Sequence, residues 1–149
     1  MKILVLNGPN LNMTGIREKG VYGSETLDMI NDEIKQYCAE RNVECEFFQS
    51  NGEGEIITKI HSLINGYDGC VINAGAYTHY SYAIRDAISC VKDFLPFIEV
   101  HMSDIHSREP FRHISVITDV CVCQICGYGK KSYMMGVDKL IELKKEKSV

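Results

Sequence analysis

The sequence lacks any long hydrophobic run, and this excludes several classes of protein. The apolar start, MKILVLNGPN, is broken by Asn7, Gly8 and Pro9, too soon for a signal peptide or a membrane anchor. A basic surface is also missing, because the net charge is -4 at pH 7 and a nucleic-acid binder needs many cations to neutralise phosphates. We therefore expect a soluble, unprocessed, cytoplasmic protein with no nucleic-acid or membrane partner.

Complete metal and nucleotide motifs are absent too. The seven cysteines are an odd number in apolar segments, as expected of buried, reduced thiols. Cys123 and Cys126 form a C-x-x-C, but no second pair or suitably spaced histidines complete a zinc set. The segment from Gly127 to Ser132 lacks the leading glycine of a phosphate-binding loop. We expect no metal and no cofactor.

The hydrophobic pattern predicts an α/β protein. Apolar or β-branched runs predict buried strands at residues 2–6, 43–48, 69–72, 97–100 and 120–126. Helical spacing predicts helices near residues 27–38, 56–64, 80–91 and 131–145. Strands that alternate with helices form a parallel sheet through right-handed crossovers. The 149 residues, 45% of them hydrophobic, therefore predict one domain, 1–149, with a flavodoxin-like three-layer sandwich and a five-stranded parallel sheet.

Polar residues follow the predicted strands, where ligands bind in open parallel sheets. Two segments, 8–23 and 102–113, are too long and polar to be simple connectors. Amides, imidazoles and a hydroxyl stand at these strand ends: Asn10, Asn12, Asn73, His79, His101 and Ser103. Gathered on one edge, they favour a polar substrate.

Three groups of residues could carry chemistry. Glu99 and His101 share a strand face by period-two geometry, and a carboxylate beside an imidazole suits a general acid; a purely structural pair is an equal alternative. Tyr22 lies in a glycine-flanked loop, about 8–23, that is long enough to act as a lid. A tyrosine has an ordinary pKa of about 10, so it serves as a base only where a neighbour such as Arg17 lowers that pKa; a packing tyrosine is the alternative.

Two arginines, Arg108 and Arg112, suit a carboxylate or several hydroxyls. A surface salt-bridge network with Glu109 or Asp104 is the alternative. His61 and His106 are interpreted as ordinary surface residues.

Taken together, seven strings resemble the type II 3-dehydroquinate dehydratases over nearly the whole chain. They are Gly8-Pro-Asn-Leu-Asn12, Arg17-Glu-x-x-x-Tyr22-Gly23, Gln49-Ser-Asn-x-Glu53-Gly54, Asn73-x-Gly-Ala-Tyr-Thr-His79, Ala83-Ile-Arg-Asp-Ala87, Glu99-Val-His101 and Arg108-Glu-Pro-Phe-Arg112-His113. The resemblance implies that 3-dehydroquinate is converted to 3-dehydroshikimate, a step of the shikimate pathway, by anti elimination through an enolate. No metal, Schiff base or nucleotide is required.

The resemblance also assigns catalytic roles. It makes Tyr22 the base, with Arg17 stabilising its phenolate. Asn10 positions a water at the enolate oxygen, and His101, supported by Glu99, protonates the leaving hydroxyl.

The binding roles come from the resemblance as well. Asn73, His79 and Arg112 match positions that bind hydroxyls, and Ser103 with the backbone of Met102 matches those that hold the carboxylate. Asp86 reaches a neighbouring subunit's site, which implies trimers assembled into a homododecamer. Further candidates are Arg108 and Asn12. The chain departs from the family pattern at Lys19, Ala74 and Tyr80.

A rival interpretation is a binding module on the same fold, either a flavin carrier or a phosphoaccepting receiver. A receiver needs an acidic pocket, yet the strand ends carry Asn7 and Asn73. A flavin carrier needs a hydroxyl-rich loop after the first strand, and here that loop offers mainly amides.

Overall fold

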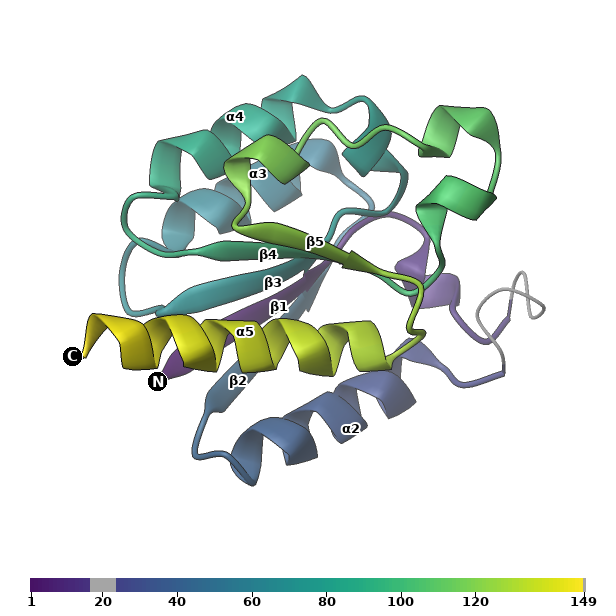
Figure 1. Cartoon of the computed structure of the whole chain (residues 1–149). Coiled ribbons are helices and arrows are strands. Elements are labelled where there is room, and N and C mark those ends of the chain that lie inside the picture. The colour runs from purple at the N-terminus through teal and green to yellow at the C-terminus, as the bar shows by residue number, and fades with distance from the viewer. Residues whose placement is uncertain (17–23, 149) are drawn as a thin grey trace.

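A five-stranded parallel sheet forms the middle layer of the protein (Figure 1). In the computed structural model, which describes residues 1–16 and 24–148, the strands are β1 (Lys2–Asn7), β2 (Glu44–Gln49), β3 (Gly69–Asn73), β4 (Phe97–His101) and β5 (Cys123–Cys126). Their order across the sheet is β2-β1-β3-β4-β5, and all pairs are parallel. This is the flavodoxin-like order, so the predicted fold is confirmed.

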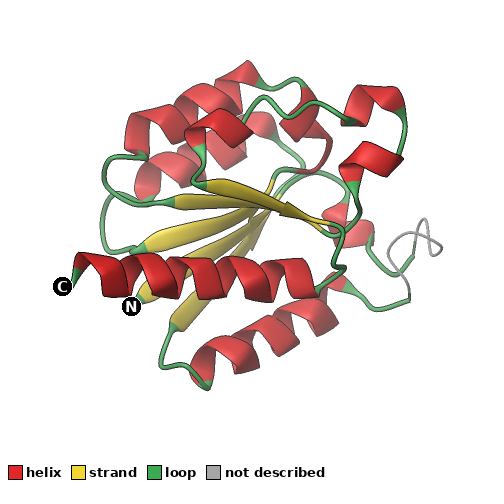
Figure 2. Cartoon of the chain, in the orientation of Figure 1, coloured by secondary structure: helices red, strands yellow, loops and turns green. Residues whose placement is uncertain are grey.

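Helices cover both faces of the sheet (Figure 2). They are α2 (Leu27–Ala39), α3 (Glu53–Ser62), α4 (Tyr82–Val91) and α5 (Lys131–Lys147). Side-chain caps start two of them, because the hydroxyls of Thr26 and Ser81 accept hydrogen bonds from backbone N–H groups of the first turn. None of the helices within residues 24–148 combines the length and apolar character that crossing a membrane requires.

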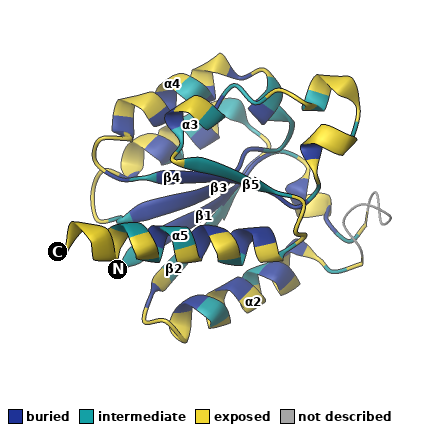
Figure 3. Ribbon diagram, in the orientation of Figure 1, coloured by how far each residue is buried: buried dark blue, intermediate teal, exposed yellow. Residues whose placement is uncertain are grey.

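Alternation along β1 divides the core into two halves. Ile3 and Val5 pack with α2 and α5, whereas Leu4 and Leu6 pack with α3 and α4. All four side chains are fully buried, and burying each one contributes about 1.5–3 kcal/mol. The three central strands, β1, β3 and β4, are therefore buried on both faces, while the edge strands are half-buried and the outer helix faces are exposed (Figure 3).

Several predicted boundaries differ from the structure, including the second helix, which runs from Glu53 to Ser62 rather than over 56–64. Two of these differences have clear local reasons. The last strand begins at Cys123 rather than at residue 120, because Thr118–Val120 forms a 3₁₀ turn whose first hydroxyl donates to Glu99. The third helix begins at Tyr82 rather than at residue 80, because Gly75–His79 forms a separate 3₁₀ turn and Ser81 caps the helix.

The loops after β1 and β3 touch closely at the carboxyl edge of the sheet. The backbone N–H of Gly8 donates to Asn73 O at 2.8 Å. A Cβ atom at Gly8 would lie 2.4 Å from the backbone oxygen of Ala74. Only glycine fits this approach, which brings the first loop against the end of β3.

Candidate active site

A pocket opens at the carboxyl edge of the sheet, among the loops that follow β1, β3 and β4. Eight of the residues predicted from the sequence line it: Asn10, Asn73, His79, His101, Met102, Ser103, Arg108 and Arg112. The residues come from segments far apart in the chain because parallel strands end on the same edge. The predicted location of the site is therefore where the structure has its polar pocket.

The predicted pair on β4 is in hydrogen-bond contact. His101 Nε2 donates to Glu99 Oε2 at 2.6 Å, and both side chains are buried. This bond fixes the ring, which lines the pocket. The other ring nitrogen, Nδ1, has no hydrogen-bond partner among the described residues. A protonated His101 could donate from Nδ1 to a ligand while Glu99 balances its charge.

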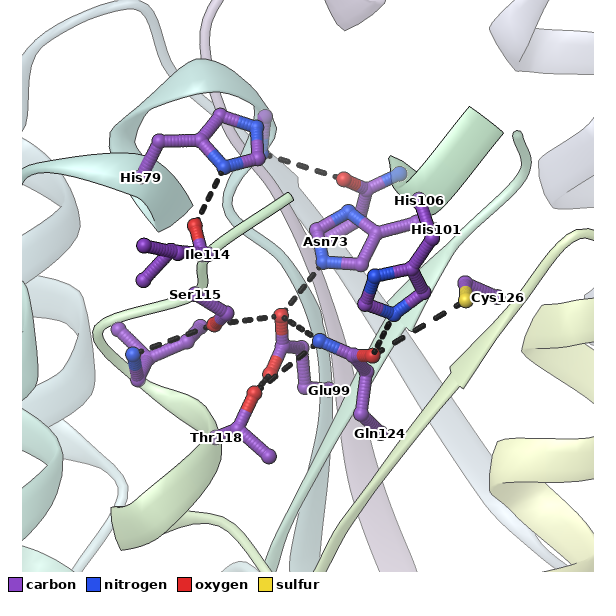
Figure 4. Close-up of polar contacts among 12 residues, drawn as sticks. Asn73, His79, Glu99, His101, His106, Ile114, Ser115, Thr118, Gln124 and Cys126 are labelled. Carbon is purple, nitrogen blue, oxygen red and sulfur yellow. Dashed lines mark hydrogen bonds and ion pairs between the residues drawn. The ribbon is translucent and has the colours of Figure 1, made fainter. Parts of the chain in front are cut away.

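The Glu99 carboxylate is held by three further donors (Figure 4). Ser115 Oγ and Gln124 Nε2 donate to Oε2 at 2.9 and 3.2 Å, and the Thr118 hydroxyl donates to Oε1. Burial alone would raise the pKa of Glu99, but the hydrogen bond and charge of His101, with the hydroxyl donors, outweigh it and lower that pKa. Glu99 therefore stays ionised although it is fully buried.

The hydrogen bond and the burial of His79 define the protonation state of its ring, which lines the pocket. Its Nδ1 lies 2.9 Å from the backbone oxygen of Ile114, which can only accept, so Nδ1 carries the proton. Burial lowers the pKa of His79, which favours the neutral ring. Its Nε2 is then an acceptor, suited to a ligand hydroxyl.

A chain of buried polar groups positions Asn73. Its Nδ2 donates to Tyr133 Oη at 3.0 Å, and Tyr133 donates in turn to Asn7 Oδ1 at 2.5 Å. Asn73 Oδ1 accepts from the Gly75 N–H at 3.1 Å. One N–H and one lone pair of the Asn73 amide remain for a ligand.

The arginine segment is partly paired within itself. Arg112 Nε donates to Glu109 at 3.1 Å, and Arg108 Nε lies 3.8 Å from the same carboxylate. Arg108 Nη1 also reaches Ser103 Oγ at 3.4 Å. The predicted salt-bridge network therefore exists between the two arginines and Glu109. Both arginines also line the pocket, where their guanidinium groups can bind an anion.

Asn10 adopts a strained backbone at the pocket mouth. Its φ is 68°, a left-handed value that is uncommon outside glycine. The backbone N–H of Asn10 donates to Asn51 Oδ1 at 2.9 Å, which holds the turn. Asn12 does not line this pocket; its Oδ1 accepts from Gln49 Nε2 at 3.5 Å.

Asp86 does not line the pocket of its own chain and is exposed on α4. Its neighbour Arg85 donates to the Val116 carbonyl at 2.8 Å and lies 3.6 Å from Asp119. Arg17 and Tyr22 lie outside the described residues.

Sequence reasoning missed the residues that support the site. These are Ser115, Thr118 and Gln124 around Glu99, and Tyr133 beside Asn73. A fully buried glutamate must have donors, so their existence could be anticipated. Their identity depends on register, since Gln124 is paired with Glu99 across β4 and β5.

One set of described residues could hold a metal ion. The ligand atoms of Asp104, His106 and Cys126 all lie within 4.8 Å of one another. This cluster is beside the pocket and contains none of the eight predicted residues that line it.

An open parallel sheet with a buried carboxylate–imidazole pair and two guanidiniums at its carboxyl edge defines a small-molecule enzyme of the α/β class. The chain belongs to the class II dehydroquinase family, whose model, described as "Dehydroquinase class II", matches residues 1–141. This membership decides against the binding-module alternative.

Individual relatives agree. The 3-dehydroquinate dehydratase of Caldicellulosiruptor bescii is 54% identical over 143 residues, which cover 95% of this chain and 97% of the relative. The type II dehydroquinase structure from Butyrivibrio crossotus has a TM-score of 0.92 and 56% identity, and the match covers 94% of this chain and 97% of that one. The type II dehydroquinase structure from Propionibacterium acnes has a TM-score of 0.88 and 39% identity, over 93% and 94% of the two chains.

Proposed function

We propose that the chain dehydrates 3-dehydroquinate to 3-dehydroshikimate in the shikimate pathway, by anti elimination through an enolate and without a cofactor. The observation that carries this proposal is the buried His101 on the wall of a polar pocket, hydrogen-bonded to Glu99 behind it, in a chain of the class II dehydroquinase family. An elimination needs a base and an acid, and the pair supplies the acid.

His101 is the acid. Its Nε2 is committed to Glu99, so Nδ1 is the atom that gives a proton to the departing hydroxyl. Glu99 remains ionised and offsets the charge of the imidazolium. Because Glu99 acts through His101, we class it as a positioning residue rather than one that touches the substrate.

Tyr22 is the base, and it removes the proton next to the ketone. Arg17 stabilises its phenolate, and Asn10 holds a water at the enolate oxygen. These three roles rest on the family resemblance. For Asn10 the structure adds support, because Asn10 lines the pocket and its backbone is held by Asn51. Residues 8–23 act as the lid of a single catalytic domain spanning 1–149.

The substrate's polar groups match the pocket wall. His79 Nε2 and the free positions of the Asn73 amide are suited to ring hydroxyls, with Arg112 beside them. Ser103 and the Met102 backbone hold the carboxylate, and Arg108, which reaches Ser103 Oγ at 3.4 Å, adds a positive charge there. Asn12 supports the first loop and does not contact the substrate.

The family resemblance also implies a homododecamer built from trimers, in the cytoplasm. Asp86 is exposed on α4 and absent from its own pocket, which suits a residue that completes a neighbouring subunit's site. The mass of the assembly in solution tests this part.

The decisive experiment follows the ultraviolet absorbance of the conjugated enone after 3-dehydroquinate is added with no cofactor. The native chain should produce it, and Tyr22→Phe should nearly abolish it with an unchanged circular dichroism spectrum. Tyr37→Phe is the matched control, because Tyr37 bonds Asp138 on α5 and lies away from the pocket. An active Tyr22→Phe enzyme would refute the assigned base. Covalent trapping of the substrate by borohydride would refute the mechanism.

A further inference from the structure

We propose that Asp104, His106 and Cys126 form a binding site for a zinc-like divalent cation, with Gln124 as a fourth ligand, and that a bound cation slows the enzyme. The site is separate from the reaction, which needs no metal in the proposal above. The part of the inference that concerns rate rests on the proposed function; the part that concerns binding does not.

The ligand types select the class of cation. A thiolate, an imidazole and a carboxylate suit Zn²⁺ and similar borderline cations, whereas Mg²⁺ and Ca²⁺ prefer oxygen ligands alone. The ligand atoms of the three side chains lie within 4.8 Å of one another, and Cys126 Sγ is 4.0 Å from Asp104 Oδ1. Neighbouring ligands of a tetrahedral zinc are about 3.3–3.7 Å apart, so the cluster must contract by about 1 Å.

The backbone already holds the ligands in place. Asp104 caps the 3₁₀ turn Ile105–Ser107, where its Oδ1 accepts from the His106 N–H at 3.0 Å. Cys126 ends β5, and the next N–H, that of Gly127, lies 3.3 Å from His101 O. Asp104 and His106 are therefore held together in one turn, and Cys126 is anchored to the sheet beside them.

Gln124 completes the arrangement (Figure 4). Its Nε2 donates to Glu99 and Thr118, so its Oε1 must face the cluster. There it lies 3.4 Å from His106 Nε2 and 4.0 Å from Cys126 Sγ. These separations are long for hydrogen bonds. The Gln124 oxygen, the His106 nitrogen and the Cys126 sulfur therefore surround a space that a cation could fill. The thiol proton leaves to solvent when the metal–sulfur bond forms.

A cation at this site would act on the catalytic pair. Cys126 is paired with His101 across β4 and β5, and Gln124 with Glu99. A positive charge on the neighbouring strand opposes the protonated imidazole that must serve as the acid, so we expect turnover to fall about five- to tenfold.

Binding is tested first, with Co²⁺ as the probe and no substrate present. The native chain should develop the near-ultraviolet charge-transfer band of a Co²⁺–thiolate bond, saturating at one Co²⁺ per chain, and Zn²⁺ should abolish it. Cys126→Ser should lose the band, and Asp104→Asn, which keeps the cap acceptor, should weaken binding at least tenfold. Cys123→Ser is the matched control, because Cys123 lies on the same strand but packs in the apolar cluster on the other face. No band in the native chain, or an unchanged one in Cys126→Ser, would overturn the site.

The dehydration assay is then repeated with and without Zn²⁺. The native chain and Cys123→Ser should slow, and Cys126→Ser should not. Equal inhibition of Cys126→Ser would overturn the link to turnover. The two proposals fail separately: a chain that binds Co²⁺ but forms no enone refutes the proposed function alone, and one that forms enone but binds no Co²⁺ refutes this site alone.

Discussion

Replacing Glu99 by glutamine removes one charge from the centre of the site and almost nothing else. Glu99 is fully buried and accepts four hydrogen bonds. A glutamine oxygen at the Oε2 position can still accept from His101, Ser115 and Gln124. Its amide nitrogen, at the Oε1 position, can donate to the Thr118 hydroxyl. The packing and the hydrogen-bond count can therefore survive, while the counter-charge of His101 is lost.

The size of the effect follows from the bond that changes. A hydrogen bond to a charged group contributes about 1.5–3 kcal/mol, and one between neutral groups contributes about 0.5–1.5 kcal/mol. The middle values of these two ranges differ by about 1.2 kcal/mol, which is close to the roughly 1.4 kcal/mol that makes a factor of ten in an equilibrium or a rate. Since the charged imidazole is the acid of the reaction, we expect kcat to fall about tenfold, with KM changed little because Glu99 does not touch the pocket.

The measurement is steady-state formation of the enone by Glu99→Gln, with circular dichroism to check the fold. Glu46→Gln is the matched control, because Glu46 also carries hydrogen bonds on a strand, to Lys2 and Tyr67, but lies away from the pocket. The control should keep its kcat. A Glu99→Gln enzyme that folds and keeps kcat within about twofold, against the tenfold loss expected from the charge, would refute the role of the pair.

The same residue gives a prediction for stability against pH. The pKa of Glu99 is lowered in the folded chain, so its carboxylate contributes stability above its unfolded pKa of about 4.3, and this is lost as pH falls through the folded pKa. Urea unfolding should therefore show the native chain losing stability relative to Glu99→Gln below about pH 4. A pH-independent difference between the two would contradict this sign.

Three further predictions concern the pocket and the residues that support it. Gly8→Ala should unfold at lower temperature and lose activity, because the new Cβ would lie 2.4 Å from a backbone oxygen; a melting curve checks it. Tyr133→Phe should cost about 1–3 kcal/mol in urea unfolding, since the buried amides of Asn7 and Asn73 lose their shared hydroxyl. The pKa of His79 is lowered in the folded chain, so as pH falls the unfolded chain binds a proton at His79 before the folded chain does. Stability should therefore fall below about pH 6.5. In an acid titration of stability, His79→Asn should lack the part of this fall that is due to His79.

The strands β4 and β5 show which features could be predicted from the sequence and which could not. Period-two geometry along 97–101 was enough to put Glu99 and His101 on one face, and the structure confirms their contact at 2.6 Å. The start of β5 was predicted three residues too early, because Thr118–Val120 forms a 3₁₀ turn whose Thr118 hydroxyl donates to Glu99. Alternation predicts faces, whereas an interaction between segments 19 residues apart depends on the packed fold.

The two cysteines of the C-x-x-C also show what the sequence could and could not predict. Their placement in a strand was predicted, and a separation of three residues puts them on opposite faces. Cys123 packs in the apolar core, while Cys126 meets Asp104 and Gln124. The linear motif suggested a pair that the sheet separates, and it gave no sign of the cluster with His106, because those ligands come from a different loop.

The sequence by itself determined the layered fold and the edge at which the site lies, because hydrophobic periodicity is local and parallel strands end together. The family resemblance supplied the substrate, together with the roles of Arg17 and Tyr22. Only the tertiary structure decided which donors keep Glu99 ionised, how the amide of Gln124 is turned, and which nitrogen of His79 faces the pocket. These follow from strand register and from the need of each buried polar group for a partner, and neither can be read from residues that are distant along the chain.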